Sequence, residues 1–99
     1  MAVEVVLAPD ARDDLVSIYL WVEAAAGEAK AEEYDARIRK ACLSLADFPN
    51  RGTPRGDLGR GVRSILFERQ ATIAYRVLAA RVEILAIAHR ARDLGEPLV

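Results

Sequence analysis

The sequence has few cysteines, histidines and lysines. The shortage of cysteine and histidine excludes disulfide and metal sites. The single cysteine, Cys42, cannot form an internal disulfide, and together with the single histidine it provides too few ligands for a zinc site. We therefore expect no metal and no cofactor. Cys42 falls on the apolar stripe of a predicted helix, so we interpret it as a small buried hydrophobic residue rather than a nucleophile.

Long hydrophobic runs are also absent. No stretch approaches the roughly 18 apolar residues that span a bilayer, and the N-terminus lacks the pattern of a signal peptide. These absences predict a cytoplasmic protein with no membrane partner. The glycine-containing segment from Gly52 to Gly61 has no GKT or GKS ending and no following helix, so it is not a P-loop. Nothing else indicates an ordinary metabolic enzyme.

What the sequence does contain is typical of one small globular domain covering residues 1–99. Hydrophobic residues make up 53% of the 99 residues and charged residues 29%, with a formal net charge of −1. The charge is unevenly divided, because nine arginines and three acids lie between residues 51 and 92. Such a basic half suits an acidic protein segment, a nucleic acid or an acidic patch on an enzyme. The alternative is that the arginines only cover the outer face of a sheet.

The hydrophobic pattern of the first half predicts a short edge strand followed by a helical hairpin. The strand is expected at Val3–Leu7. Pro9 is a suitable first residue for a helix that ends at Gly27, and a second helix is predicted from Glu28 to Phe48. Because the turn between the helices is short, they must fold back on each other.

Three strands are predicted after a loop that reaches Gly61. They are expected at Val62–Phe67, Ala71–Leu78 and Val82–His89, and their short connections allow only antiparallel neighbours. The last strand is apolar on both faces, which indicates a central or covered position. The expected fold is α+β with the order β-α-α-β-β-β: an N-terminal strand, an α-helical hairpin and a three-stranded antiparallel sheet.

The first helix carries more apolar residues than one buried face requires. Val16, Leu20 and Trp21 lie outside the stripe that faces the core. Since tryptophan is frequent at interface hot spots, we expect these residues to bind a partner. The alternative is that Trp21 only covers the edge of the hairpin.

Four ordered pieces of the sequence together resemble ParE-type toxins of the RelE/ParE superfamily of type II toxin–antitoxin systems. Each piece is unspecific alone, but their order and spacing are specific. They are L-A-P-D-A-R-D-D-L at residues 7–15, the P…G…G-x-R pattern of Pro49, Gly52, Gly61 and Arg63, A-Y-R-V at residues 74–77, and the closing strand from Ile84 to Asp93.

The resemblance implies a growth-arresting toxin, of a kind linked to plasmid maintenance, that inhibits DNA gyrase and stabilises its cleaved-DNA complex. It also implies a ParD-like antitoxin that forms a heterotetramer or larger assembly with the toxin. No sequence-specific DNA binding is expected from this chain alone. The residues expected to contact the target are Arg63, Arg76, His89, Arg90, Arg92 and Asp93. Those expected to contact the antitoxin are Val16, Leu20, Trp21, Arg60 and Arg63.

The main alternative is a ribosome-dependent mRNA endoribonuclease of the RelE branch. Arg63, Arg76 and His89 would then be the catalytic candidates. This alternative is less favoured, since no tyrosine follows Tyr75 and both lysines lie in the second predicted helix. A non-toxic antitoxin-binding relative is a further possibility.

Three of the candidate residues also have purely structural interpretations. His89 would anchor the C-terminal segment through Asp93, Arg63 would pair with an acid of the helical hairpin, and Tyr75 would belong to the core. The segment from Arg90 to Val99 is too short and polar to extend the core, so we expect it to contribute to toxicity.

Overall fold

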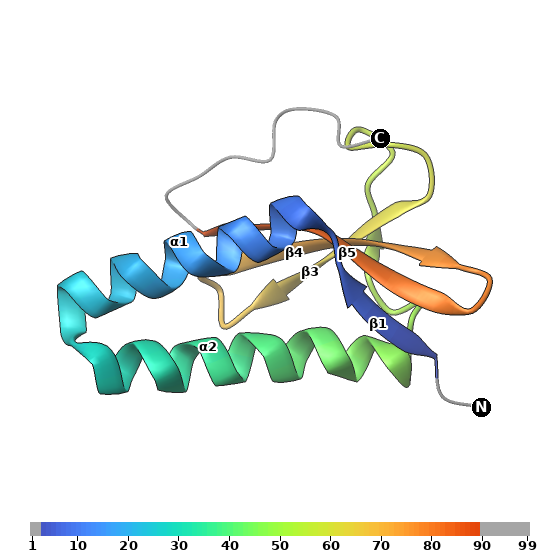
Figure 1. Ribbon diagram of the computed structural model, residues 1–99. Helices are drawn as coiled ribbons and strands as arrows, with labels where there is room; N and C mark the ends of the chain where they lie inside the picture. Colours follow the sequence, from blue (N-terminus) through green and yellow to red (C-terminus); the bar gives the residue numbers. More distant parts are fainter. Residues whose placement is uncertain (1–2, 90–99) are drawn as a thin grey trace.

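Within residues 3–89, which the structure describes, a five-stranded sheet carries a pair of antiparallel helices on one face (Figure 1). The structure is a computed structural model. The strands follow the order β1-β5-β4-β3-β2 across the sheet. The elements are β1 (Glu4–Leu7), α1 (Pro9–Ala26), α2 (Glu28–Leu43), the 3-10 turn η1 (Ser44–Ala46), β2 (Thr53–Pro54), β3 (Val62–Phe67), β4 (Ala71–Leu78) and β5 (Arg81–His89).

Helix α1 begins and ends where its sequence signals predict. Pro9 is its first residue, and Ala8 provides no side-chain cap, so the backbone carbonyl of Ala8 accepts from the Arg12 N–H at 3.1 Å. At the other end Gly27 has φ of 94°, a conformation that glycine adopts without a Cβ clash, and its N–H donates to the Glu23 carbonyl. The chain then turns directly into α2. Neither helix within residues 3–89 has the length and hydropathy that a membrane span requires.

Helix α2 is shorter than predicted. It ends at Leu43 and continues only as the turn η1, so the prediction of a helix reaching Phe48 is wrong at its C-terminal end. The Ser44 hydroxyl donates to the Ala41 carbonyl at 2.6 Å, and Pro49 disfavours helical backbone at the residue before it. Together these effects account for the early stop.

In the sheet β5 is an interior strand, covered on both edges by β1 and β4, and the sheet contains one strand more than predicted. The predicted bounds of β3 and β4 are confirmed, and β5 begins at Arg81, one residue earlier than expected. β1 is an edge strand, as predicted, but it pairs parallel with β5, so the sheet is not purely antiparallel. The pairing satisfies backbone groups that an open edge of β5 would leave without partners. β2, in the segment predicted to be loop, adds a two-residue pairing to β3.

The core lies between the helical hairpin and the sheet. Its largest fully buried side chains include Leu15 and Ile38 from the helices and Ile73, Tyr75 and Ile84 from the sheet. A second, smaller cluster lies on the opposite face of the sheet, where Leu58 of the loop before β3 packs against Val62, Ala74 and Leu85. The sheet is therefore covered on both faces in part, by helices on one side and by the loop on the other.

Cys42 is buried in the core, as predicted, with 3% of its surface exposed. Burial raises the pKa of its thiol to about 11. The thiol is therefore protonated at pH 8, and since thiolate is the reactive form, we expect the folded protein to resist a thiol reagent that labels the unfolded chain within minutes. Labelling with a chromogenic disulfide, with and without urea, tests this. Equal rates in the two conditions would contradict it.

Candidate functional site

The sequence pattern that indicated the family forms a hydrogen-bonded anchor beneath the loop that follows η1. The Tyr75 hydroxyl accepts from the Gly52 N–H at 2.9 Å and donates to the Pro49 carbonyl at 2.8 Å. The Arg63 Nη1 donates to the carbonyls of Asn50 at 3.1 Å and Gly52 at 2.8 Å. We call these five residues the loop anchor. They join the start of the loop to β3 and β4.

Two predictions are decided by the loop anchor. Tyr75 is fully buried, which confirms its place in the core. The interpretation of Arg63 as a partner of an acid on the helical hairpin is wrong, because its guanidinium bonds to backbone carbonyls instead. Loop carbonyls can hold a guanidinium in this way because its N–H groups lie in a fixed plane. Arg63 is consequently half-buried and turned toward the loop.

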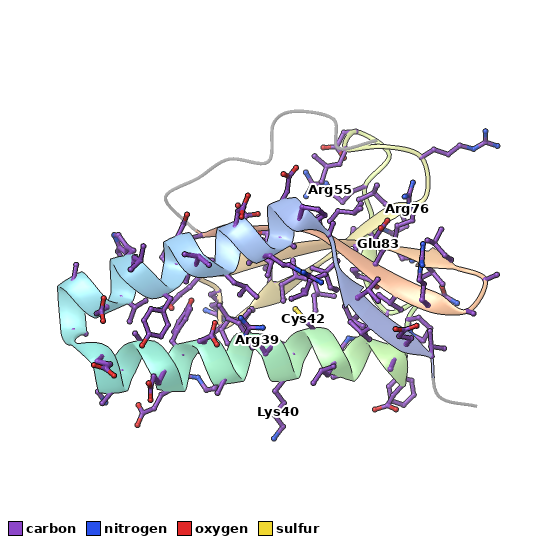
Figure 2. All side chains as sticks on the ribbon, viewed as in Figure 1. Arg39, Lys40, Cys42, Arg55, Arg76 and Glu83 are labelled. Carbon is purple, nitrogen blue, oxygen red and sulfur yellow. The ribbon has the colours of Figure 1, made fainter. Side chains whose placement is uncertain are left out.

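Arg76 lies on the other face of the sheet. It is the cross-strand partner of Val62, which belongs to the cluster on the face away from the helices, and of Glu83 on β5. The Arg76 Nη2 donates to Glu83 Oε1 at 2.9 Å, and Figure 2 shows the two side chains meeting. The charge of Arg76 is thus matched by a neighbouring carboxylate.

His89 is the last described residue of β5 and is 8% exposed. Its ring centroid lies 4.6 Å from that of Trp21, which is 55% exposed, and 6.3 Å from that of Tyr34. The expected anchoring contact with Asp93, and the predicted target contacts Arg90, Arg92 and Asp93, lie outside the described residues.

The three candidate catalytic residues are not brought together. Arg63 and His89 are cross-strand partners of Tyr75 and Ala71 on β4. These two positions on β4 are four residue steps apart, which corresponds to roughly 13 Å along an extended strand. Arg76 points from the opposite face of the sheet. Among residues 3–89, no group of three histidine, cysteine or acidic side chains is arranged to hold a metal ion either.

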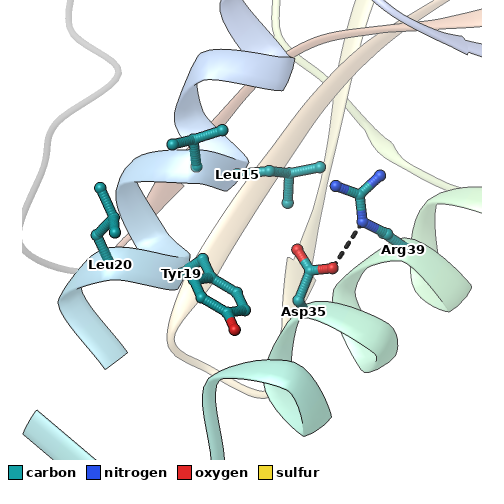
Figure 3. A pocket seen from close by; sticks show the side chains of 6 residues that line it. Leu15, Tyr19, Leu20, Asp35 and Arg39 are labelled. Atoms are coloured by element: carbon teal, nitrogen blue, oxygen red, sulfur yellow. Dashed lines mark hydrogen bonds and ion pairs between the residues drawn. The ribbon is translucent and has the colours of Figure 1, made fainter. Parts of the chain in front are cut away.

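A groove between α1 and α2 contains part of the predicted antitoxin-binding set (Figure 3). It has a volume of about 210 Å³ and is lined by Leu15, Val16, Tyr19, Leu20, Asp35 and Arg39, which we call the helical groove. Val16 and Leu20 are 58% and 56% exposed, and the Asp35–Arg39 ion pair, at 2.7 Å, adds a charged rim.

The remaining predicted antitoxin contacts lie elsewhere. Trp21 follows Leu20 by about 100° around α1, which turns it away from the helical groove and toward His89. Arg60 is exposed in the loop before β3, and Arg63 belongs to the loop anchor. A partner that contacted all five residues would have to pass around α1 and reach the loop.

The turn between β3 and β4 was predicted as a short connection, but the sequence did not indicate its backbone conformation. Glu68 and Arg69 have φ of 49° and 59°, and the turn is closed by a hydrogen bond from Gln70 N–H to the Phe67 carbonyl. Two central residues with positive φ are typical of a type I′ turn, which favours Asn-Gly. Left-handed backbone costs about 1–2 kcal/mol for a residue with a side chain. The sequence Glu-Arg carries no signal for such a turn.

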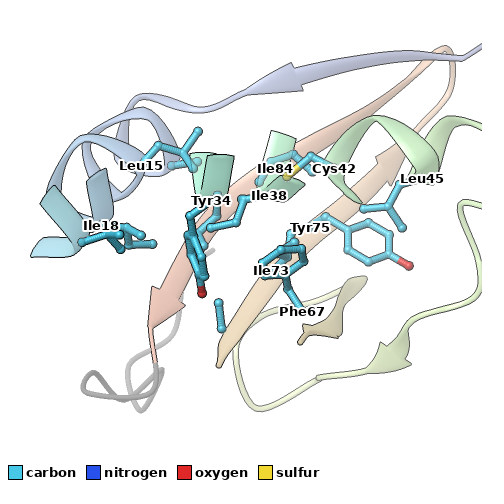
Figure 4. Packing of buried hydrophobic residues seen from close by; sticks show 14 of the residues in the cluster. Leu15, Ile18, Tyr34, Ile38, Cys42, Leu45, Phe67, Ile73, Tyr75 and Ile84 are labelled. Atoms are coloured by element: carbon cyan, nitrogen blue, oxygen red, sulfur yellow. The ribbon is translucent and has the colours of Figure 1, made fainter. Parts of the chain in front are cut away.

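Glu68 is held by α2. The Arg37 Nε and Nη2 donate to its two carboxylate oxygens at 2.8 and 3.1 Å. The guanidinium also lies 5.4 Å from the centroid of the Tyr34 ring, which meets the Phe67 ring edge-on. Figure 4 shows Tyr34 and Phe67 at this end of the core, with the Tyr34 hydroxyl pointing away from Leu15. We call residues 68–70 the hairpin tip.

Comparison with solved structures finds proteins of the same fold, two of them from toxin–antitoxin systems. Among solved structures, the chromosomal ParDE toxin–antitoxin system from P. aeruginosa is 26% identical with a TM-score of 0.78, covering 89% of this chain and 96% of that one. The RelBE2 toxin–antitoxin complex from Mycobacterium tuberculosis is 24% identical with a TM-score of 0.65, covering 91% and 100%. A conserved hypothetical protein from Helicobacter pylori, 12% identical with a TM-score of 0.56 over 91% and 97%, shares the fold alone.

The family comparison covers most of the chain. Comparison with curated proteins gives no match. The sequence model of the family described as "ParE toxin of type II toxin-antitoxin system, parDE" matches residues 5–94, which include the loop anchor, both helices and, within the described residues 3–89, every strand except the first residue of β1. The chain belongs to the ParE toxin family of type II toxin–antitoxin systems.

Proposed function

We propose that this toxin inhibits DNA gyrase, that it stabilises the cleaved-DNA complex of the enzyme, and that a ParD-like antitoxin neutralises it. Membership of the ParE family and the likeness to a ParDE system support this proposal. The proposed target contacts remain Arg63, Arg76 and His89 of the sheet, together with Arg90, Arg92 and Asp93.

The observation that carries the proposal is the separation of the candidate catalytic groups. An mRNA endoribonuclease needs a base, an acid and phosphate-binding cations around one scissile bond. Here Arg63 is bonded to loop carbonyls, Arg76 to Glu83, and His89 is buried beside Trp21. These contacts favour a toxin that acts by binding over one that acts by catalysis.

The helical groove is the surface we propose for the antitoxin. Val16 and Leu20 provide exposed apolar contacts, and Asp35 and Arg39 provide a charged rim for an amphipathic segment. A segment that continued around α1 would also contact Trp21, and one that continued to the loop would reach Arg60. We propose a heterotetramer or larger assembly for the complex.

Trp21→Ala is expected to weaken binding of the ParD-like antitoxin by about 2 kcal/mol, roughly thirtyfold in Kd, because a half-exposed tryptophan on a proposed interface fits a hot spot. Leu66→Ala is the matched control, since Leu66 is 71% exposed on the face of the sheet away from the helices. Isothermal titration calorimetry measures both. Equal affinities for Trp21→Ala and the control would remove Trp21 from the interface.

The gyrase proposal is tested by adding the purified toxin to gyrase and relaxed plasmid. We expect loss of supercoiling that is restored when the antitoxin is added first. Uninhibited supercoiling by gyrase, in the presence of folded toxin that arrests growth in cells, would reject gyrase as the target.

A further inference from the structure

We propose that the hairpin tip binds the protein target of this toxin, with Arg69 as the contacting residue and the Arg37–Glu68 pair as the element that positions it. The inference rests on the proposed function, since it assumes that the toxin acts by binding a target. The surface that Arg69 would bind is a carboxylate-bearing region of that target protein. None of the four sequence pieces that resemble the family includes this turn.

The backbone of the hairpin tip is the first observation. Glu68 and Arg69 both occupy left-handed backbone, where Asn-Gly would form the same turn with less strain. A turn that served only to connect β3 and β4 would be more stable with those residues. Strain of this kind gathers at binding and catalytic sites, where a particular side chain is needed in a fixed place. The residue kept at the second strained position is an exposed arginine.

The ion pair between Arg37 and Glu68 is the second observation. Arg37 binds both carboxylate oxygens of Glu68, so the first residue of the tip is fixed to α2 in position and orientation. Next to this ion pair, the ring centroids of Tyr34 and Phe67 lie 5.6 Å apart in an edge-on contact, and both residues belong to the buried core. The tip is therefore supported by packed rings and an ion pair. A preorganised loop of this kind loses little conformational freedom on binding.

The charge of Arg69 indicates which kind of molecule the hairpin tip would bind. The Arg37 guanidinium is matched by Glu68, whereas Arg69 forms no ion pair or side-chain hydrogen bond with any residue in the described range 3–89. A single arginine is a poor site for duplex DNA, whose binding depends on several cations. It suits a bidentate contact with a protein carboxylate.

The position of the tip separates it from the helical groove. Arg37 lies about 160° around α2 from Arg39, which lines the groove, so the two sites occupy different flanks of the helical hairpin. Substitutions at the tip leave the groove residues untouched. The effects on target binding and on antitoxin binding can therefore be measured independently.

The test compares Arg69→Gly, Arg69→Lys and Arg81→Gln with the unaltered toxin. Each purified protein is titrated against gyrase supercoiling, its melting temperature and antitoxin affinity are measured, and each gene is expressed to matched protein levels to score growth arrest. Arg81→Gln is the charge control, because Arg81 is exposed at the start of β5, at the end of the sheet away from the tip. Glycine at position 69 relieves strain and removes the cation.

We expect Arg69→Gly to raise the melting temperature while requiring about tenfold more protein for the same inhibition, a typical effect of losing one strong interface contact. Opposite changes in stability and potency exclude misfolding as the cause. Arg69→Lys should retain part of the potency and Arg81→Gln all of it. Arg37→Gln should weaken the toxin, but have no further effect in the Arg69→Gly background, because it acts through the tip.

Several results would overturn the proposal. Full potency of Arg69→Gly would show that the tip is only a turn. Weaker antitoxin binding with unchanged potency would assign the tip to the antitoxin. Weaker binding of the Arg69→Gly toxin alone to plasmid DNA, measured by gel shift, would assign the tip to phosphate. If the unaltered toxin leaves gyrase active, the gyrase proposal fails, and growth arrest then decides the tip: arrest lost in Arg69→Gly supports it, and arrest retained rejects it.

Discussion

Gly52→Ala is expected to destabilise the fold by about 3 kcal/mol, because the added methyl group has no space at the loop anchor. A Cβ at this position would lie 2.5 Å from the Tyr75 hydroxyl, 2.9 Å from Tyr75 Cε1 and 3.0 Å from the Ser64 carbonyl oxygen. The Tyr75 ring is fully buried and cannot move aside freely. Displacing it would also break its hydrogen bonds with the Gly52 N–H and the Pro49 carbonyl.

The comparison for this variant is Gly56→Ala, in the same loop. Apart from Gly56 itself and its two chain neighbours, no residue of the described part has an atom within 4 Å of a Cβ at position 56, so the free energy of unfolding should change by less than about 0.5 kcal/mol. Urea denaturation, followed by circular dichroism with the slope compared between variants, gives both values. A Gly52→Ala protein as stable as Gly56→Ala would mean that the loop anchor does not hold the loop in solution.

Asp14→Ala is expected to lower the free energy of unfolding by about 2.5 kcal/mol, because it leaves a buried backbone N–H of the interior strand β5 without its partner. β1 pairs with β5 only as far as Leu7 opposite Ile84, and the Ala8 N–H makes the last bond, to the Ile84 carbonyl. Further along β5, the Asp14 carboxylate of α1 accepts from the Ile87 N–H at 2.8 Å. The side chain of a helix thus continues the pairing where the edge strand ends.

Two variants separate this hydrogen bond from general effects of charge near the start of α1. Asp14→Asn keeps an acceptor oxygen and should recover about half of the lost stability. Asp13→Ala removes a neighbouring exposed acid and should change stability by less than about 0.5 kcal/mol. Amide hydrogen exchange at Ile87 reports directly on the bond. Unchanged protection of that amide in Asp14→Ala would contradict the assignment.

The sequence predicted those parts of the fold that depend on neighbours along the chain. Pro9 and Gly27 mark the ends of α1 because their backbone preferences act locally, and the predicted bounds of β3 and β4 match the structure to the residue. The parallel pairing of β1 with β5 was not predicted, because it joins segments separated by the whole helical hairpin. β2 was not predicted either, since Thr53 and Pro54 are too few to show a period.

The candidate site was predicted less completely, for the same physical reason. Tyr75 and Gly52 are 23 residues apart, so their hydrogen bond left no mark in local periodicity, although both residues belonged to the quoted pattern. The strained tip was missed because Glu-Arg is not a turn signature. Helical geometry could have predicted that Trp21 lies on a different side of α1 from Val16 and Leu20, because adjacent residues differ by about 100° around a helix. The sequence interpretation placed all three on one surface.

The most direct test of the account is accumulation of linear plasmid DNA in gyrase reactions that contain the toxin. The reactions are stopped with detergent and digested with protease, which releases double-strand breaks trapped in the cleaved-DNA complex. We predict that linear DNA increases with toxin concentration and disappears when the antitoxin is added first. Absence of linear DNA at toxin concentrations that arrest growth, with cleaved mRNA on ribosomes in its place, would contradict the account and point to the RelE branch.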